Sequence, residues 1–98
     1  MIVKFADNQM KKICTNASVA IKKYGIQMAT IIAQRISELE AADTIDELMS
    51  FHVGKCHRLK GDRATQYAIN LIQPYRLIFT KESEQPDIVK LIEIVDYH

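Results

Sequence analysis

The chain has 98 residues, 48 % of them hydrophobic, and a formal net charge of +1 at pH 7, which fits one domain, residues 1–98, with a modest core. No apolar run approaches the ~20 residues that span a bilayer, and residues 1–5 lack the pattern of a signal peptide. We therefore expect a cytoplasmic protein without membrane association, in which Cys14 and Cys56 are free thiols.

The first half of the chain is predicted to be mainly helical. Residues 2–5 alternate in polarity and indicate a short strand. Asp7 or Asn8 then caps a helical segment over residues 8–24, for which a break near residues 15–16 stays open, and Gly25 ends it. Apolar residues at helical spacing predict a further helix over residues 26–42, with a core stripe of Met28, Ile31, Ile32, Ile36 and Leu39.

A capping box and a change of period follow this helix. Residues 44–47, Thr-Ile-Asp-Glu, have the capping-box pattern and predict a short helical turn. The period then changes to two, which predicts strands around residues 67–72, 75–80 and 88–95. Gln73-Pro74 suits a hairpin loop, and residues 81–87 suit a longer loop. Helices before strands indicate an α+β fold, with the helices packed on one face of an antiparallel sheet.

Charge is unevenly distributed along the chain. Residues 55–63 hold four cations and one carboxylate, whereas residues 38–47 hold five carboxylates and no cation. Two different functional faces would produce this pattern, and so would two plain solvated surfaces.

Three segments of the second half carry a family resemblance. They are the turn His-Arg-Leu-Lys-Gly-Asp-Arg at residues 57–63, the strand Tyr-Arg-Leu-Ile-Phe at residues 75–79, and the ending Asp-Tyr-His at residues 96–98. With them, the chain resembles the HigB-type toxins of the RelE/ParE superfamily of bacterial type II toxin–antitoxin systems, also described as plasmid-maintenance killer proteins. The N-terminal half matches these toxins only in its helical pattern.

The resemblance implies a RelE/ParE-like fold and a ribosome-dependent endoribonuclease that cuts messenger RNA without a cofactor. It implies as partners the ribosome, the message and a helix-turn-helix, HigA-like antitoxin, through which alone the toxin would act on operator DNA. Arg58 departs from the family pattern, since many relatives carry proline there. The positions that match the family's catalytic residues are His57, Lys60, Arg76, Asp96, Tyr97 and His98.

These residue types suit metal-independent RNA cleavage, which needs a base for the 2′-hydroxyl, an acid for the leaving 5′-oxygen and fixed positive charge for the phosphorane. Histidine is the residue type whose ordinary pKa lies nearest neutrality, so His57 and His98 are the natural candidates for the acid and the base. Arg76 lies between apolar strand residues, so we expect it on the open face of the sheet as a phosphate clamp. Further RNA contacts are expected from Lys55, Arg58 and Arg63.

Each residue also has a structural alternative. His57 could be an exposed strand-end histidine, His98 a frayed terminus, Asp96 a solvated carboxylate and Tyr97 an aromatic that packs on the sheet edge. Arg76 could form a cross-strand ion pair with Glu93, Lys60 and Arg63 could be plain surface cations, and Tyr67 fits the core better than the site.

Two functional alternatives remain open. One is a ParE-like toxin that inhibits DNA gyrase without cutting RNA, and the other is an inert interaction domain. A zinc site is not expected, because the sequence lacks paired cysteine or histidine spacings.

Overall fold

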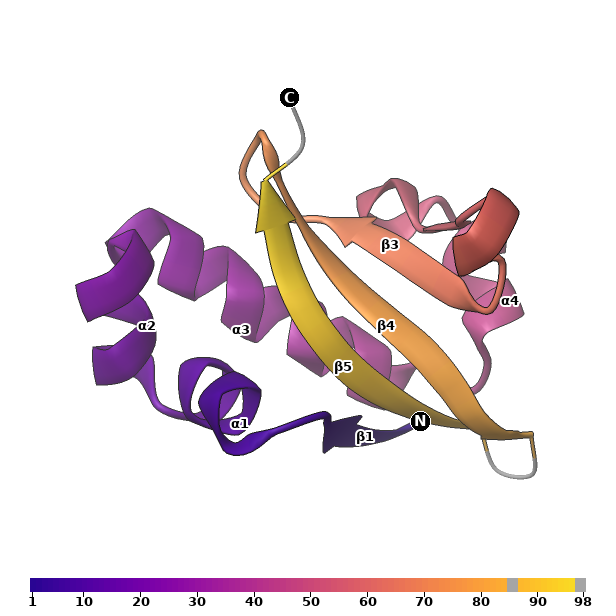
Figure 1. The fold of residues 1–98 in the computed structure, drawn as a ribbon, viewed down its shortest axis with the longest axis horizontal. Helices are drawn as coiled ribbons and strands as arrows, with labels where there is room; N and C mark the ends of the chain where they lie inside the picture. Colours follow the sequence, from indigo (N-terminus) through magenta and orange to yellow (C-terminus); the bar gives the residue numbers. More distant parts are fainter. Residues whose placement is uncertain (85–86, 97–98) are drawn as a thin grey trace.

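Five strands form one sheet, and helices cover one of its faces in the computed structural model, which describes residues 1–84 and 87–96 (Figure 1). The elements, in chain order, are β1 (Ile2–Phe5), α1 (Asn8–Thr15), α2 (Ala17–Tyr24), α3 (Ile26–Ala41), α4 (Ile45–Ser50), the 3-10 turn η1 (Val53–Lys55), β2 (His57–Arg58), the 3-10 turn η2 (Gly61–Arg63), β3 (Gln66–Asn70), β4 (Tyr75–Glu84) and β5 (Asp87–Asp96). The predicted α+β fold is confirmed.

The sheet has the strand order β1-β5-β4-β3-β2. All neighbours are antiparallel except β1 and β5, which run parallel with Ile2 opposite Ile88. The first strand of the chain therefore lies beside the last one, and α1 to α4 fill the connection between β1 and the antiparallel part of the sheet.

Local capping explains the helix boundaries. Asp7 accepts a hydrogen bond from Met10 N at 2.8 Å and begins α1. Asn16 both ends α1, through its N–H to Lys12 O, and begins α2, through its Oδ1, which accepts from Ser18 N at 3.0 Å. The break left open by the sequence is therefore present at Asn16. Gly25, with φ +89°, separates α2 from α3 in a conformation that favours glycine.

The start of α4 is stabilised from two directions. Thr44 Oγ1 accepts from Glu47 N at 3.1 Å, as the capping box predicts, but Glu47 Oε2 accepts from Asp43 N instead of the N–H of Thr44. The carboxylate of Asp87, only 4 % exposed, accepts from Ile45 N at 3.2 Å. The first residue of β5 thereby holds α4 against the sheet.

The core lies between α3 and the helix-covered face of the sheet. Met28, Ile32 and Leu39 of the predicted stripe are buried, and Ile31 and Ile36 are partly buried against them. The sheet contributes alternate strand residues that are fully buried, namely Ile69, Leu77, Phe79, Val89 and Leu91. Burial of each large apolar side chain stabilises the fold by about 1.5–3 kcal/mol.

Tyr67 belongs to this core. Its ring stacks on Phe79 with centroids 5.6 Å apart, so the preference for a core position over a site position is confirmed.

One predicted loop is wrong. Lys81 lies opposite Val89, and Ser83 lies opposite Ile88, so β4 and β5 remain paired through most of the segment predicted as a loop. The polar residues that suggested a loop form cross-strand ion pairs, Lys90 with Glu82 at 3.2 Å and Lys81 with Asp87 at 3.5 Å. Among the described residues, no helix is both long and apolar enough to cross a membrane.

Candidate functional site

The face of the sheet opposite the core carries the candidate residues. Arg76 lies in register with Asn70 on β3 and Val95 on β5, so the three side chains share one face. Tyr75 and Leu77, its neighbours in β4, pack on the core. The expectation that Arg76 leaves the core side is therefore confirmed. In Figure 1 this face is turned toward the viewer, with α3 behind the sheet.

His57 reaches the same face from the sheet edge. It pairs with Ala68, which pairs with Ile78 on β4. Ala68 and Ile78 are fully buried yet lie outside the main apolar core, as expected for the opposite face. Ala68 is two residues from Asn70 on β3, so strand spacing places the Cα atoms of His57 and Arg76 roughly 12 Å apart on a diagonal. Two long side chains can converge on one phosphate across that span.

The imidazole of His57 is oriented by the chain just before it. Its Nδ1 lies 2.9 Å from the carbonyl oxygen of Lys55. A carbonyl can only accept a hydrogen bond, so the neutral ring carries its proton on Nδ1 and leaves the lone pair of Nε2 available. His57 is exposed, and this tautomer suits it to accept a proton from a ligand.

An unusual backbone turn presents that carbonyl. His52, Gly54 and Lys55 all have positive φ, at 55°, 53° and 52°. At Gly54 a Cβ atom would lie 2.6 Å from Ile69 Cγ1 and 2.9 Å from Arg35 Nε. The turn therefore packs so closely that glycine is required there.

Arg35 connects this turn to the sheet and to α3. Its Nε donates to Asn70 O at 2.7 Å, and its Nη1 pairs with Glu38 Oε1 at 2.7 Å. Sequence reasoning missed both Arg35 and Gly54. A lone arginine inside a predicted amphipathic helix was the one available signal for the former.

Arg63 crosses the candidate face. Its Nε donates to Gln66 Oε1 at 2.7 Å, and its Nη2 pairs with Glu93 Oε1 at 2.8 Å. Glu93 lies on β5 opposite Ile78 of β4. The side chain of Arg63 enters from the β3 side, so it crosses β4 near Ile78 to reach Glu93. Arg63 thus binds one oxygen of the carboxylate that the sequence offered as a partner for Arg76, and the alternative of an Arg76–Glu93 pair stays a prediction.

The other expected RNA-binding cations lie around the same turn. The Nε of Arg58 donates to Ala64 O, which closes the turn between β2 and β3. Lys55 and Lys60 are exposed. Because Arg58 pairs with Tyr67, alternation directs it away from the face that His57 occupies.

Only part of the expected C-terminal group can be placed. Asp96 is exposed at the end of β5, opposite Tyr75 and one residue beyond the partner of Arg76. Alternation directs its side chain to the helix side of the sheet end. Tyr97 and His98 lie outside the described residues.

Burial changes the ionisation of three groups near the core. Desolvation raises the pKa of the Cys14 thiol and of the Cys56 thiol to about 11 in each case. Cys56 is buried in the core, whereas the next residue, His57, is exposed. Neighbouring residues of an extended chain are expected to point in opposite directions in this way. Desolvation and then Tyr75, whose ring centroid is 5.5 Å away, raise the pKa of Tyr24.

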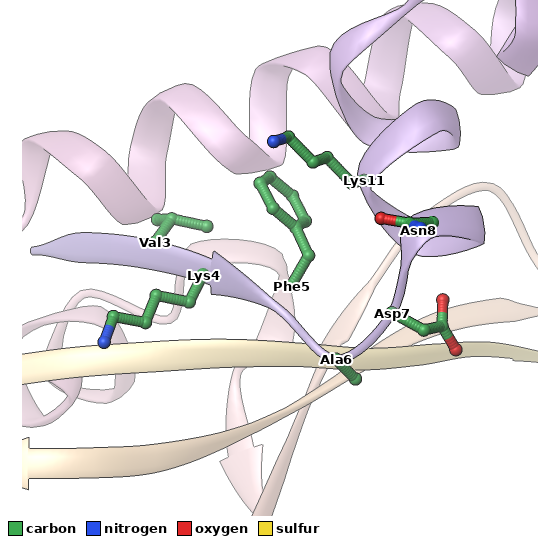
Figure 2. Close-up of a pocket in the computed structure, with 7 residues that line it drawn as sticks. All are labelled: Val3, Lys4, Phe5, Ala6, Asp7, Asn8 and Lys11. Atoms are coloured by element: carbon green, nitrogen blue, oxygen red, sulfur yellow. The ribbon is translucent and has the colours of Figure 1, made fainter.

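A hollow lies at the other edge of the sheet. It has a volume of about 720 Å³ and is formed by β1 and the start of α1. Figure 2 shows Phe5 rising from β1 and Lys11 extending toward it from α1. Since β1 and β2 are the opposite edges of the sheet, this hollow is separate from His57. Within residues 1–84 and 87–96, no group of three or more metal-ligating side chains is present.

Comparisons with known proteins agree with the fold. No curated protein sequence matches the chain. A solved structure, the YoeB/ParE toxin from Agrobacterium tumefaciens, superposes with a TM-score of 0.67 at 13% identity and covers 100% of both chains, which shows a shared fold. A family model described as RelE-like toxin of type II toxin-antitoxin system HigB matches residues 3–98. The chain therefore belongs to the RelE-like, HigB-type toxins of type II toxin–antitoxin systems.

Proposed function

We propose that this toxin is a ribosome-dependent endoribonuclease that cuts messenger RNA by attack of the 2′-hydroxyl on the adjacent phosphate. The observation that supports the proposal is that His57 and Arg76 lie on one face of the sheet, with the ring of His57 held by Lys55 O at 2.9 Å. A proton acceptor and a guanidinium on the same face supply two of the three groups that the reaction needs.

In this scheme, His57 Nε2 takes the proton of the 2′-hydroxyl. The 2′-oxygen forms a bond to phosphorus, the bond from phosphorus to the 5′-oxygen breaks, and that oxygen takes a proton from an acid. The products are a 2′,3′-cyclic phosphate and a 5′-hydroxyl end. The resemblance supplies Asp96, Tyr97 and His98 as candidates for the acid and for stacking on a base. Of these, Asp96 would have to turn from the helix side of the sheet end to reach the phosphate. Arg76 and Lys60 stabilise the charge on the phosphorane.

The cations at residues 55–63 would draw the RNA backbone to the same edge of the sheet. Membership in a type II system implies an antitoxin. We propose that this antitoxin is a helix-turn-helix protein and that it makes the contacts with operator DNA. The toxin itself would act in the cytoplasm, on translating ribosomes.

The test uses a defined message, either alone or bound to purified ribosomes in a translating state. Wild type, His57→Ala and Arg76→Ala are compared, with primer extension to map the cuts and end-group analysis of the upstream fragment. We expect cuts only with ribosomes, a cyclic or 3′-phosphate end, and a rate that falls roughly 10²–10⁴-fold in either variant. Gln27→Ala, an exposed change on α3, is the control and should cut normally.

If the wild-type toxin cuts the message without ribosomes, the proposed ribosome dependence is wrong. Growth arrest on expression with intact messages and DNA damage would favour gyrase inhibition, the alternative that the shared fold with a YoeB/ParE toxin keeps relevant. Absence of both growth arrest and cutting would favour the inert domain.

A further inference from the structure

A second surface feature lies on the helix side of the molecule, where the end of α3, α4 and η1 meet. A mainly apolar groove of about 200 Å³ opens there. Its apolar walls come from Ala41 at the end of α3, Ala42, Leu48 of α4, Phe51 and Val53. The groove is small and suits one apolar anchor side chain of a partner, which is how binding hot spots are commonly built.

Phe51 is the least buried large apolar residue that the structure describes. Its side chain is 75 % exposed. A phenyl ring left in water beside an apolar groove costs hydrophobic free energy that a covering partner would recover. Its position directly after α4, whose residues Ile45 and Leu48 are buried, leaves it without an evident role in the core.

The groove is bordered by negative charge. Glu38 and Glu47 belong to its lining, and exposed Glu40, Asp43 and Asp46 follow nearby in a stretch of ten residues without a cation. Arg35 compensates Glu38 at 2.7 Å, and the N-terminal ammonium lies at the end of α3, where it donates to Glu40 O at 2.8 Å. The negative charge away from these two cations is on the α4 side. The groove thus combines an apolar centre with a carboxylate border.

We propose that this groove binds a basic amphipathic helix of the cognate antitoxin, with an apolar anchor seated beside Phe51 and lysine or arginine side chains opposite the carboxylates. The chemistry follows the helix-in-groove mode of recognition, in which apolar contacts supply affinity and the charged border sets orientation and association rate. The proposal rests on the toxin family, which implies an antitoxin, and does not depend on the nuclease chemistry.

A second copy of the chain fits this surface less well. A two-fold symmetric contact would place the carboxylate border of one copy against the same border of the other. Like charges brought together in this way disfavour association, whereas a basic helix neutralises them.

The groove also lies away from the candidate RNA site. Its walls belong to the helices and η1, while His57 and Arg76 use the opposite face of the sheet. Changes in the groove can therefore be tested separately from changes in toxicity.

The decisive experiment measures the affinity of the purified toxin for the antitoxin encoded in the same operon, by titration calorimetry. We compare wild type, Phe51→Ala and Glu47→Gln, with Ile26→Ala as the matched control, because Ile26 is 67 % exposed on another part of the surface. Glu47→Gln keeps an oxygen that can accept from Asp43 N. We expect Phe51→Ala to weaken binding roughly thirtyfold, Glu47→Gln to weaken it severalfold with a smaller salt dependence, and Ile26→Ala to change nothing.

Growth arrest by Phe51→Ala without antitoxin should match wild type, while co-expressed antitoxin should rescue the cells poorly. Unchanged affinity in Phe51→Ala, with thermal stability retained, would overturn the proposal. So would a toxin dimer that dissociates on Phe51→Ala, since it would assign the groove to a second copy. Loss of RNA cleavage in any of these variants would bear on the proposed nuclease activity. It would not affect the test of antitoxin binding, because the affinity is measured separately.

Discussion

Arg63 Nη2 pairs with Glu93 Oε1 at 2.8 Å across the face of the sheet that carries His57 and Arg76. Both side chains are partly exposed, at 40 % and 45 %, so the pair stabilises the fold by no more than about 1 kcal/mol. Its main consequence is for RNA binding. A phosphate that approaches Arg63 has to compete with the carboxylate of Glu93 for the guanidinium.

Glu93→Gln should therefore strengthen RNA binding. Removal of the carboxylate charge releases the guanidinium of Arg63, and we expect a two- to fivefold tighter affinity, which corresponds to about 0.5–1 kcal/mol. The measurement is fluorescence anisotropy with a 2′-O-methyl RNA oligonucleotide, which cannot undergo the proposed cleavage.

Glu82→Gln is the matched control, because it removes the same kind of charge from the Lys90–Glu82 pair at 3.2 Å. If both variants bind equally well, the gain reflects net charge alone and Arg63 has no special part. Arg63→Ala should weaken binding and abolish the effect of Glu93→Gln.

Gly54 and Gly61 offer a paired test of the turns that flank His57. Both have positive φ, +53° and +66°, but a Cβ at Gly54 would meet Ile69 Cγ1 at 2.6 Å, whereas nothing lies within 4 Å at Gly61. Gly61→Ala should lower the free energy of unfolding by about 1–2 kcal/mol, the cost of left-handed backbone. Gly54→Ala adds an overlap in the core and should lower it by about 2–4 kcal/mol.

Urea denaturation of the two variants measures the difference. Equal losses would mean that Ile69 and Arg35 move aside freely and that the close packing of η1 is not required.

Local patterns predicted much of this fold. Caps and apolar spacing predicted the start of α1 and the extent of α3 and left a break near Asn16 open, and alternation placed Arg76 on the correct face. Such features depend on neighbours in the chain, so they are visible in the sequence. The length of the β4–β5 hairpin was missed, because its polar residues are satisfied by partners on the other strand.

The candidate site was predictable to a smaller extent. Strand β2 has two residues, too few for a periodic signal, so the register that brings His57 opposite Ala68 could not be inferred. The Arg63–Glu93 pair joins residues that are 30 positions apart. Contacts of this kind depend on the register of three strands at once.

Asp87 provides a test of the link between α4 and the sheet. It is 4 % exposed, accepts from Ile45 N at 3.2 Å and lies 3.5 Å from Lys81 Nζ. Asp87→Ala leaves the buried N–H of Ile45 without an acceptor, so we expect a loss of about 2–4 kcal/mol in the free energy of unfolding. Asp87→Asn retains an oxygen acceptor and should lose less, about 1–2 kcal/mol.

Hydrogen exchange at Ile45 reports the same contact directly. Its amide should exchange faster in Asp87→Ala than in Asp87→Asn, and equal exchange rates would show that Thr44 alone holds the start of α4.

The two thiols that folding desolvates make stability depend on pH in the alkaline range. The pKa of Cys14 and that of Cys56 are each raised to about 11 from an ordinary value of 9.0, so the folded state favours the protonated thiol. Between pH 9 and 11 the unfolded chain loses these protons first. The contribution of the thiols to stability is therefore fully present below pH 9 and is lost as the pH rises toward 11.

Comparison of wild type with the Cys14→Ala/Cys56→Ala variant isolates this effect. The other groups of the protein, Tyr24 among them, are common to both variants, so their contributions cancel in the difference. The difference in unfolding free energy, from urea titrations at pH 8, 9, 10 and 11, should move in favour of the alanine variant as the pH rises. A difference that stays constant over this range would mean that the two thiols ionise as readily in the folded protein as in the unfolded chain, and that water reaches both of them.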